Sequence, residues 1–422
     1  MWSRCQTFLR HALVSVCNSW HWDSVSELFR FLARWRFVLL TPATAQSLRL
    51  RPCDFNHRDF GRSADCVRFD SPIKRKAYLS SRIGLVVKLF LFPSYAAPDP
   101  RHENAWRVRV SGACLKAKTQ KLRRKVLLNI LRRLTDLSEE ELHSELCRQR
   151  GEPFFLAGSR KSRILFEIDG QPIAKMKKTK RNGQFRAKFL VKNSELSADV
   201  SESRFIELSA RDEESNVEAG KLRIPLIAEE GKSIISDIDD TIKFSNVENR
   251  AELLANTFTR PFETVAGMAE LFQQFQKSDG YEYHYVTASP WQLYEPLYEF
   301  LCDNGFPAGS MHFRTFRVSD HLLKRLGVIH RSGKAAAVRR ILGSFPKREF
   351  TLIGDSGEKD IEIYARCYQQ FPDRVKRVLI RLVKPEHVHR ESVIEGRLLL
   401  PESVFQVYET ADELAKILRD SD

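Results

Sequence analysis

The chain of 422 residues lacks several features that would place it in a known class at once. No apolar run reaches the roughly 18 residues that a membrane-spanning helix requires. The eight cysteines include no Cys-x-x-Cys pair, which argues against a structural zinc site or a disulfide framework and is typical of a reducing compartment. Internal repeats and low-complexity tracts are also absent. With 42% hydrophobic and 29% charged residues, we expect a soluble, cytoplasmic protein with an ample core.

The charge is distributed unevenly along the chain. Residues 231–422 carry 26 Lys and Arg against 28 Asp and Glu, a balance of −2, whereas residues 1–230 carry 43 against 26, or +17. The net charge of +15 therefore comes from the upstream half. The downstream half is nearly neutral, and the candidate chemistry lies there.

The first acidic cluster follows a short apolar stretch at residues 234–235. Asp237, Asp239 and Thr241 come next, in the string Ser-Asp-Ile-Asp-Asp-Thr-Ile-Lys. Because side chains alternate along an extended segment, the two aspartates leave the backbone on the same side. One carboxylate could attack phosphorus while the other handles the proton, and their mutual repulsion calls for a cation such as Mg2+. The alternative is an acidic turn after a strand.

A second acidic cluster follows the apolar run at residues 350–353. Asp355 and Asp360 lie in the string Gly-Asp-Ser-Gly-Glu-Lys-Asp. In an open parallel sheet, ligands bind at the carboxyl ends of strands, so we expect these carboxylates to join Asp237 and Asp239 in one pocket. The alternative is a solvated loop with a helix cap.

Two further side chains fit the same pocket. The strand-forming residues 283–286 end at Thr287, whose hydroxyl can donate to a phosphate oxygen without adding charge. Ser289 precedes a proline, and we expect it to cap the following helix. Lys334 precedes a helix predicted over 335–342, where the helix dipole favours an anion, so binding a phosphate and a carboxylate would explain it. The alternative is a solvated lysine.

The downstream half alternates strands and helices. Strands are predicted near residues 233, 283, 351 and 378, with a closing amphipathic helix over 409–419. This order predicts an α/β fold with a parallel sheet and helices on both faces. About forty residues separate the first two strands, so we expect a small cap that leaves the site open to a bulky or membrane-held substrate.

The upstream half divides into two predicted segments. Residues 81–230 alternate apolar and polar side chains and predict a smaller, mostly antiparallel β domain with a helical insertion over about 117–149. Residues 1–80 have little periodicity, and we expect a poorly ordered or unassigned extension, with an organelle transit peptide as the alternative. Residues 231–422 complete the division as the catalytic domain.

Two basic stretches of the upstream half suggest partners. The run 175–181 lies beside the Asn182-Gly183 turn, and we expect a hairpin tip that contacts an anionic membrane surface. A nucleic-acid contact or a solvated tip are the alternatives, and nucleic acid is disfavoured because no aromatic residue interrupts the cations. The stretch 116–134 has leucines at helical spacing and predicts either an interfacial helix or one packed on the β domain with its cations outward.

In order along the chain, the candidate residues resemble the four motifs of the haloacid-dehalogenase (HAD) superfamily of aspartate-nucleophile phosphohydrolases. The string around Asp237, Ser-Pro-Trp-Gln-Leu-Tyr at 289–294 and Leu-Ile-Gly-Asp-Ser-Gly-Glu-Lys-Asp at 352–360 resemble Mg2+-dependent phosphatidate phosphatases of the actin-patch type. Arg260-Pro261-Phe262 lies where that family has similar residues, and Ala288 stands where the family often has Asn. The resemblance covers about residues 232–385 and implies a HAD-like, Rossmannoid fold.

This resemblance also implies a role for each candidate residue. Asp237 would form an aspartyl-phosphate, and Asp239 would protonate the leaving alkoxide and then deprotonate the water. Thr287 and Lys334 would hold the phosphoryl oxygens. The residues implied for the Mg2+ site are Asp237, Asp239 through its backbone carbonyl, Asp355 and, in support, Asp360.

The sequence thus predicts a Mg2+-dependent phosphatidate phosphatase that releases diacylglycerol and phosphate. One alternative keeps the chemistry and changes the substrate to a nucleic-acid end, a phosphoprotein or a metabolite. Another is a non-catalytic membrane-binding protein built on the same fold. We expect a cytoplasmic location with peripheral contact to an anionic membrane.

Overall fold

The computed structural model describes most of the chain downstream of residue 86. The described residues are 87–116, 121–176, 178–180, 182–196, 204–314 and 333–419. The extension predicted over residues 1–80 lies outside this part of the chain, as do Lys177 and Arg181 of the basic run.

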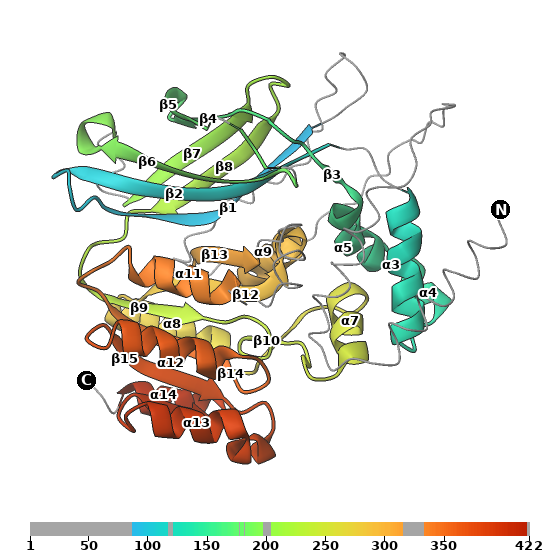
Figure 1. Ribbon diagram of the computed structural model, residues 1–422, viewed down its shortest axis with the longest axis vertical. Helices are drawn as coiled ribbons and strands as arrows, with labels where there is room; N and C mark the ends of the chain where they lie inside the picture. Colours follow the sequence, from blue (N-terminus) through green and yellow to red (C-terminus); the bar gives the residue numbers. More distant parts are fainter. Residues whose placement is uncertain are drawn as a thin grey trace, which may run out of the picture.

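The centre of the molecule is a six-stranded, fully parallel sheet with the strand order β13-β12-β9-β14-β15-β16 (Figure 1). Its strands are β9 (Lys232–Ser236), β12 (Glu282–Pro290), β13 (Gly309–Arg314), β14 (Glu349–Asp355), β15 (Val375–Arg381) and β16 (Phe405–Tyr408). The strands predicted near 233, 283, 351 and 378 are confirmed as β9, β12, β14 and β15, the four central strands. The two edge strands, β13 and β16, were not predicted.

Helices cover both faces of this sheet, which confirms the predicted α/β layering. On one face lie α8 (Met268–Asp279), α9 (Tyr294–Asp303) and α14 (Ala411–Arg419), and on the other lie α11 (Gly333–Leu342), α12 (Asp360–Gln370) and α13 (Glu391–Leu399). The alternation of side chains along the central strand β9 explains why both faces of the sheet are covered. Ile234 packs in the first core cluster and Ile235 in the second, because successive strand side chains point to opposite faces. The closing helix predicted over 409–419 is α14.

The segment between β9 and α8 is where a small cap was predicted. It contains the two-stranded sheet of β10 (Lys243–Phe244) and β11 (Glu263–Thr264), with α7 (Arg250–Phe258) between them. Asn249 caps α7 by accepting hydrogen bonds from the backbone N–H groups of Ala251 and Glu252.

Two four-stranded antiparallel sheets precede the parallel sheet along the chain (Figure 1). One contains β1 (Val87–Pro98), β2 (Ala105–Lys116), β3 (Ala157–Gly158) and β6 (Gln184–Lys192), and the other β4 (Ile164–Ile168), β5 (Gln171–Met176), β7 (Phe205–Asp212) and β8 (Glu218–Pro225). That these strands form a domain of their own, with boundaries at 80 and 230, remains a prediction.

The basic run 175–181 is not a hairpin tip, so that expectation was wrong. Strand β5 pairs with β4, whereas β6 pairs with β2 in the other sheet, and the run between them crosses from one sheet to the other. Buried Thr179 anchors the crossing, because its hydroxyl donates to the Ser159 carbonyl at 2.6 Å. The Asn-Gly signal marks a turn, but tertiary contacts decide which strands it joins.

The helical insertion consists of α3 (Lys121–Leu134), α4 (Glu139–His143) and α5 (Glu145–Phe155), and ends six residues later than predicted. Leu127 and Leu131 of α3 are buried in the first core cluster, and α3 contacts α5 and α7. These two leucines therefore face protein, which favours the packing alternative over the membrane one, although α3 contacts helices α5 and α7 rather than packing mainly on the β domain as predicted. No helix in the described ranges is both long enough and apolar enough to cross a membrane.

Strand β1 joins the upstream sheets to the parallel sheet through an aromatic seam. The ring of Phe92 lies 5.0 Å from that of Tyr294 and 5.5 Å from that of Phe313, measured between centroids. Tyr95 is fully buried, and its hydroxyl lies 3.0 Å from Ser344 Oγ. The core is thus continuous between the two halves of the chain.

Candidate active site

Three neighbouring strands bring the predicted site residues to one edge of the sheet. Asp237 directly follows β9, Asp355 ends β14, and Thr287 lies near the end of β12. All three side chains are buried. The Asp237 backbone N–H donates to the Ile353 carbonyl at 2.9 Å, which ties the end of β9 to β14. The structure therefore brings these sequence-predicted residues together.

Lys334 lies at the start of α11 and reaches the first aspartate. Its Nζ is 2.6 Å from Asp237 Oδ1, contacts Asp360 Oδ1, and lies 3.2 Å from Glu358 Oε2. Burial lowers the pKa of this ammonium, but the three carboxylates outweigh burial and raise the pKa of Lys334 well above its usual value. Lys334 is thus held charged beside Asp237.

Carboxylates outnumber cations around this ammonium. Asp237, Asp355 and Glu358 each offer an oxygen within 4.8 Å of the others. Burial, together with the neighbouring carboxylates, raises the pKa of Asp237 and Asp355, and it raises the pKa of Glu358 to about 7. Asp355 Oδ2 is buried and has no hydrogen-bond partner among the residues that the structure describes. An orphaned oxygen among crowded carboxylates fits a divalent cation with oxygen ligands.

The geometry differs in one respect from the predicted metal set. Glu358, which was not singled out, lies with Asp237 and Asp355. Asp360 instead contacts Lys334 through one oxygen and accepts the Asp355 backbone N–H at 3.3 Å through the other. The predicted ligand set of Asp237, Asp239, Asp355 and Asp360 remains a prediction, with Glu358 as an additional candidate.

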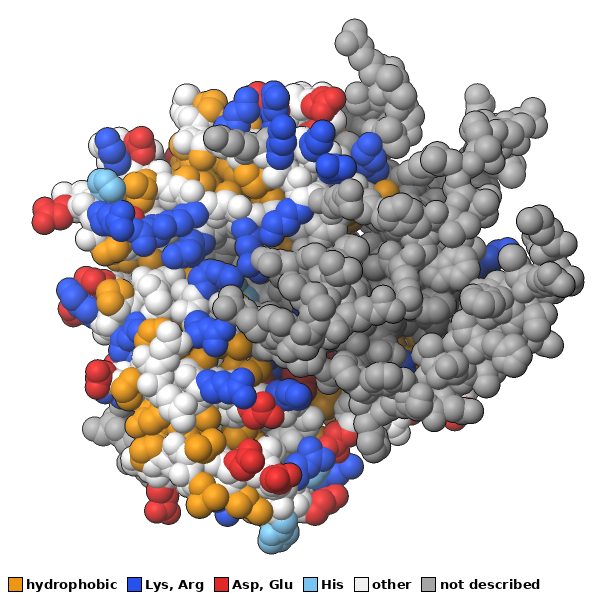
Figure 2. Space-filling view, viewed as in Figure 1, with side chains coloured by type: hydrophobic (Ala, Val, Ile, Leu, Met, Phe, Trp, Pro, Cys, Tyr) orange, Lys and Arg blue, Asp and Glu red, His pale blue; other side chains and the backbone are white. Residues whose placement is uncertain are grey.

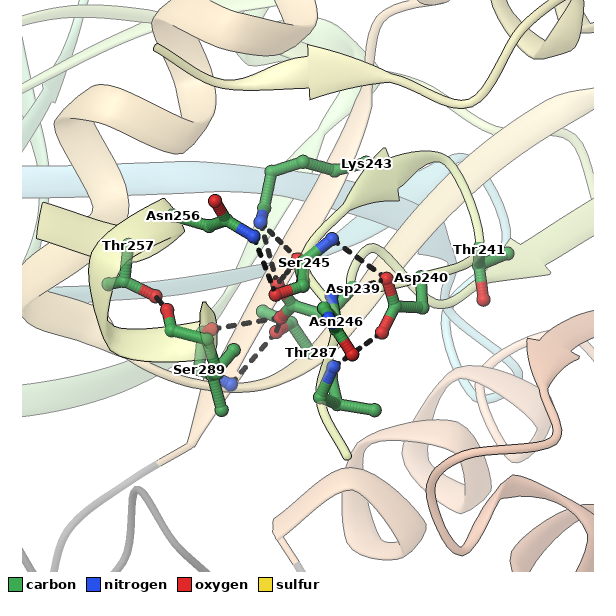
Figure 3. A network of polar contacts seen from close by, with 12 residues as sticks. Asp239, Asp240, Thr241, Lys243, Ser245, Asn246, Asn256, Thr257, Thr287 and Ser289 are labelled. Atoms are coloured by element: carbon green, nitrogen blue, oxygen red, sulfur yellow. Dashed lines mark hydrogen bonds and ion pairs between the residues drawn. The ribbon is translucent and has the colours of Figure 1, made fainter. Parts of the chain in front are cut away.

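Asp239 lies in a separate network of donors (Figure 3). Its carboxylate is 3.0 Å from Lys243 Nζ and accepts hydrogen bonds from Ser245 Oγ at 2.7 Å, Ser289 Oγ at 2.9 Å and Thr287 Oγ1 at 3.1 Å. Burial raises the pKa of Asp239, but Lys243 and these hydroxyls prevail and lower it to about 2. The two aspartates of the first motif therefore occupy opposite electrostatic environments.

The helix-cap expectation for Ser289 was wrong. Strand β12 continues to Pro290, and the short 3-10 helix that follows begins only at Trp291. Ser289 is thus still on the strand, and its hydroxyl donates to Asp239. Thr287, expected on a phosphoryl oxygen, donates to the same carboxylate in this structure.

Asp240, which was not predicted as functional, shapes the loop after β9. Its backbone is left-handed, with φ of 53°, and its carboxylate accepts the N–H groups of Ser245, Asn246 and Val247 at 2.6–2.8 Å (Figure 3). These bonds fix Ser245 where it can donate to Asp239. The consecutive aspartates in the sequence are the signal that could have indicated this role.

A clasp from the helical insertion supports the same loop. The Phe262 ring lies between two cations, with the Arg150 guanidinium 3.6 Å and Lys243 Nζ 4.8 Å from its centroid. Arg150 Nη1 also donates to the carbonyls of Thr257 at 3.0 Å and Arg260 at 2.6 Å. We call this arrangement the Arg150 clasp. It links α5 to the end of α7 and, through the Phe262 ring, to Lys243, the cation that contacts Asp239.

A family model for the catalytic domain of phosphatidate phosphatase APP1 matches residues 232–382. These residues form an APP1-type catalytic domain. All six predicted site residues lie within it, whereas Arg150 lies outside.

Two curated proteins are similar to part of this chain. "Uncharacterized protein C29B5.04c" of Schizosaccharomyces pombe is 30% identical over 198 residues, which cover 46% of this chain and 31% of that protein. Phosphatidate phosphatase APP1 of Saccharomyces cerevisiae is 31% identical over 154 residues, which cover 36% of this chain and 26% of that enzyme. The chain spans less than a third of either relative. A solved flavohemoglobin from Malassezia yamatoensis, 8% identical, reaches a TM-score of only 0.12 over 76% of this chain and 60% of that chain, which carries no argument about the fold.

Proposed function

We propose that this protein is a Mg2+-dependent phosphatidate phosphatase with a HAD-like catalytic domain, releasing diacylglycerol and phosphate. The observation that carries the proposal is the buried Asp237 carboxylate, which lies at the end of the central strand with Lys334 Nζ at 2.6 Å. A nucleophilic carboxylate needs this position at the sheet edge, where an incoming phosphate can reach it. The APP1-type domain supplies the substrate class.

Mg2+ fits the carboxylate cluster described above. Asp237, Asp355 and Glu358 would hold it, with the Asp239 carbonyl and Asp360 in support, because their oxygens suit a hard cation and Asp355 Oδ2 lacks any other partner. When bound, the ion supplies positive charge that offsets the carboxylates and the phosphate oxygens.

In the first step, Asp237 attacks phosphorus through Oδ2, which in this structure accepts a hydrogen bond from the Thr241 hydroxyl at 3.3 Å, and the bond from phosphorus to the glycerol oxygen breaks. Lys334 keeps its contact with Asp237 and neutralises charge on the phosphoryl group. The leaving alkoxide takes a proton from Asp239. The resting pKa of about 2 would keep Asp239 ionised, but an arriving phosphate dianion raises it, because a like charge nearby favours the protonated form.

In the second step, water hydrolyses the aspartyl-phosphate. Asp239, again a carboxylate, takes the proton from the water, the bond from phosphorus to Asp237 breaks, and phosphate leaves. Thr287 and Ser289, which donate to Asp239 in this structure, hold that carboxylate in place and can turn their hydroxyls toward phosphoryl oxygens. We place this chemistry in the cytoplasm at the surface of an anionic membrane, because the proposed substrate is a lipid.

The test is phosphate release by the full chain from phosphatidate in mixed micelles, beside a panel of soluble phosphomonoesters, with Mg2+ or with EDTA. We expect Mg2+-dependent turnover of phosphatidate and a loss of about a thousandfold or more in Asp237→Asn, since the nucleophile is removed. Asp303→Asn, an exposed aspartate at the end of α9, is the matched control and should keep full activity.

Each outcome bears on a different part of the proposal. Activity that survives Asp237→Asn does not arise at this site and overturns the mechanism. Efficient turnover of a soluble ester without turnover of phosphatidate keeps the mechanism and replaces the substrate.

A further inference from the structure

A cavity lies away from the carboxylate cluster, between the antiparallel strands β2 and β6 and the helix α11. It has a volume of about 170 Å³. Five cations line it: Arg109, Lys180, Arg186, Lys188 and Arg340. Aromatic side chains, among them Phe92, Trp291 and Phe313, form another part of its wall.

Three of these cations, Arg109, Lys188 and Arg340, lack a carboxylate partner among the described residues. No Asp or Glu is among its described lining residues, and Arg109, Lys188 and Arg340 form no ion pair within the described ranges. Arg109 Nε is buried and has no hydrogen-bond partner in the described part of the chain. Figure 2 shows Lys and Arg side chains gathered on this face, from the antiparallel strands down to the level of α11, with few carboxylates between them.

Two ionisable groups of the lining, His312 and Arg340, have lowered pKa values. Burial, and then Arg340 and Arg186, lower the pKa of His312 to about 3, so its imidazole stays neutral inside the cavity. Burial foremost, with Arg109 contributing, lowers the pKa of Arg340. Arg109 and Arg340 are partly buried, and like charges that crowd together at partly buried positions repel each other unless an anion joins them. This arrangement is typical of a site prepared for an anionic ligand.

We propose that this cavity binds a phosphate group, carried either by an anionic lipid or by a small phosphate ester. Guanidinium groups match the geometry of phosphate oxygens through paired hydrogen bonds. The volume is below the roughly 300–1,000 Å³ of pockets for drug-sized ligands, so the cavity admits a head group or a small ester rather than a whole lipid. The aromatic wall can contact the glycerol or carbon part of such a ligand.

The proposal does not depend on the hydrolytic function. No carboxylate of the catalytic cluster lines this cavity, so the two sites bind separately. They share helix α11, which carries Lys334 near its start and Arg340 six residues later, about 9 Å along the helix axis. Failure of one assignment leaves the other standing.

The experiment compares the full chain with the double variant Arg109→Gln/Arg340→Gln. Inorganic phosphate is titrated while the unfolding temperature is followed, with EDTA present so that the metal-free carboxylate cluster repels anions. We expect phosphate to raise the unfolding temperature of the wild type, and to bind the double variant about a hundredfold more weakly, since each charged hydrogen bond contributes about a factor of ten. The double variant should fold, because it loses unbalanced positive charge.

Arg366→Gln, an exposed arginine of α12, removes the same kind of charge elsewhere and should respond to phosphate as the wild type does. Lys188→Gln, at an exposed position of the lining, is a second variant that leaves the core untouched and should weaken phosphate binding several-fold. An equal response in the wild type and the lining variants, or no response in the wild type, overturns the proposal.

Two further arms separate the sources of the phosphate group. Cosedimentation with phosphatidylcholine vesicles that contain phosphatidylserine, lost in the double variant and kept in Arg366→Gln, assigns the cavity to a lipid head group. Stabilisation by glycerol 3-phosphate without vesicle binding assigns it to a small ester. Vesicle binding that the double variant retains shows that lipid binds elsewhere and overturns the lipid assignment.

Discussion

Glu358 allows a direct test of the crowded carboxylate cluster, because its replacement should stabilise the metal-free protein. Burial, together with Asp360 and Asp239, raises the pKa of Glu358 from 4.5 to about 7 despite the nearby Lys334. A group whose pKa is raised by folding opposes folding once it ionises. Below pH 4.5 it is protonated in both states and costs nothing. Stability is lost as the pH rises to about 7 and is constant above that.

The size of this destabilisation follows from the shift in the pKa of Glu358. Each pKa unit corresponds to about 1.4 kcal/mol, so ionised Glu358 destabilises the metal-free fold by about 3 kcal/mol at pH 8. This is an upper value, because 24% of the side chain is exposed. Glu358→Gln should therefore be more stable than the wild type by about 1–3 kcal/mol at pH 8 in EDTA, and equal to it at pH 4.5.

Urea unfolding of both proteins at the two pH values, in EDTA, measures this difference. Glu395→Gln, an exposed glutamate of α13, is the control and should match the wild type at both pH values. Saturating Mg2+ should reverse the order, since a ligand at a hundred times its Kd stabilises the fold by about 2.7 kcal/mol and the variant lacks one candidate ligand. A variant that is no more stable than the wild type at pH 8 in EDTA would refute the electrostatic reasoning.

Three other substitutions test the surroundings of the site. In Gly354→Ala, the added Cβ would collide with the Asp360 carboxylate, so phosphate release and Mg2+ affinity should fall about tenfold or more; unchanged kinetics would show that Asp360 has no supporting role. Arg150→Met leaves the carbonyls at the end of α7 unsatisfied and should cost about 2–4 kcal/mol in urea unfolding, whereas exposed Arg148→Met should cost under about 0.5 kcal/mol; equal costs would contradict the clasp. Phe345→Ala removes a fully buried ring and should cost about 3–5 kcal/mol, and a loss below about 1 kcal/mol would count against the packing described.

The sequence was sufficient to predict the parallel sheet and the residues at its edge. Each of the central strands is a short apolar run followed by a polar residue that could bind a ligand or take part in a reaction. Parallel strands end at a common edge of the sheet. Asp237, Thr287 and Asp355 follow from this rule alone. The edge strands β13 and β16 lack such a signal, so they became visible only in the fold.

The finer geometry of the site depends on loop conformations that spacing does not determine. Asp355 Oδ1 accepts the N–H groups of Gly357 at 2.6 Å and Glu358 at 2.9 Å, and this turn brings a carboxylate oxygen of Glu358 within 4.8 Å of those of Asp237 and Asp355. Ser289 looked like a helix cap because it precedes a proline, but one more residue of strand directs its hydroxyl to Asp239.

Long-range contacts left no local signal at all. Arg150 lies 110 residues before Arg260, whose carbonyl it binds, and nothing in the spacing of either segment indicates the pairing. The same holds for Lys243, whose neighbour Phe262 is placed by the return of the chain through α7 and β11. Such contacts arise from the packing of separate elements, so only coordinates show them.

The aromatic seam at β1 has a practical consequence for dissecting this protein. The homology border set by the family model lies at residue 232, yet the rings of Trp291, Tyr294 and Phe313 are covered by Phe92, and Ser344 is bonded by Tyr95. A recombinant fragment cut at the homology border would leave these rings exposed to water and prone to self-association. The hydrolytic half is thus completed by its upstream neighbour, and the two are best produced together.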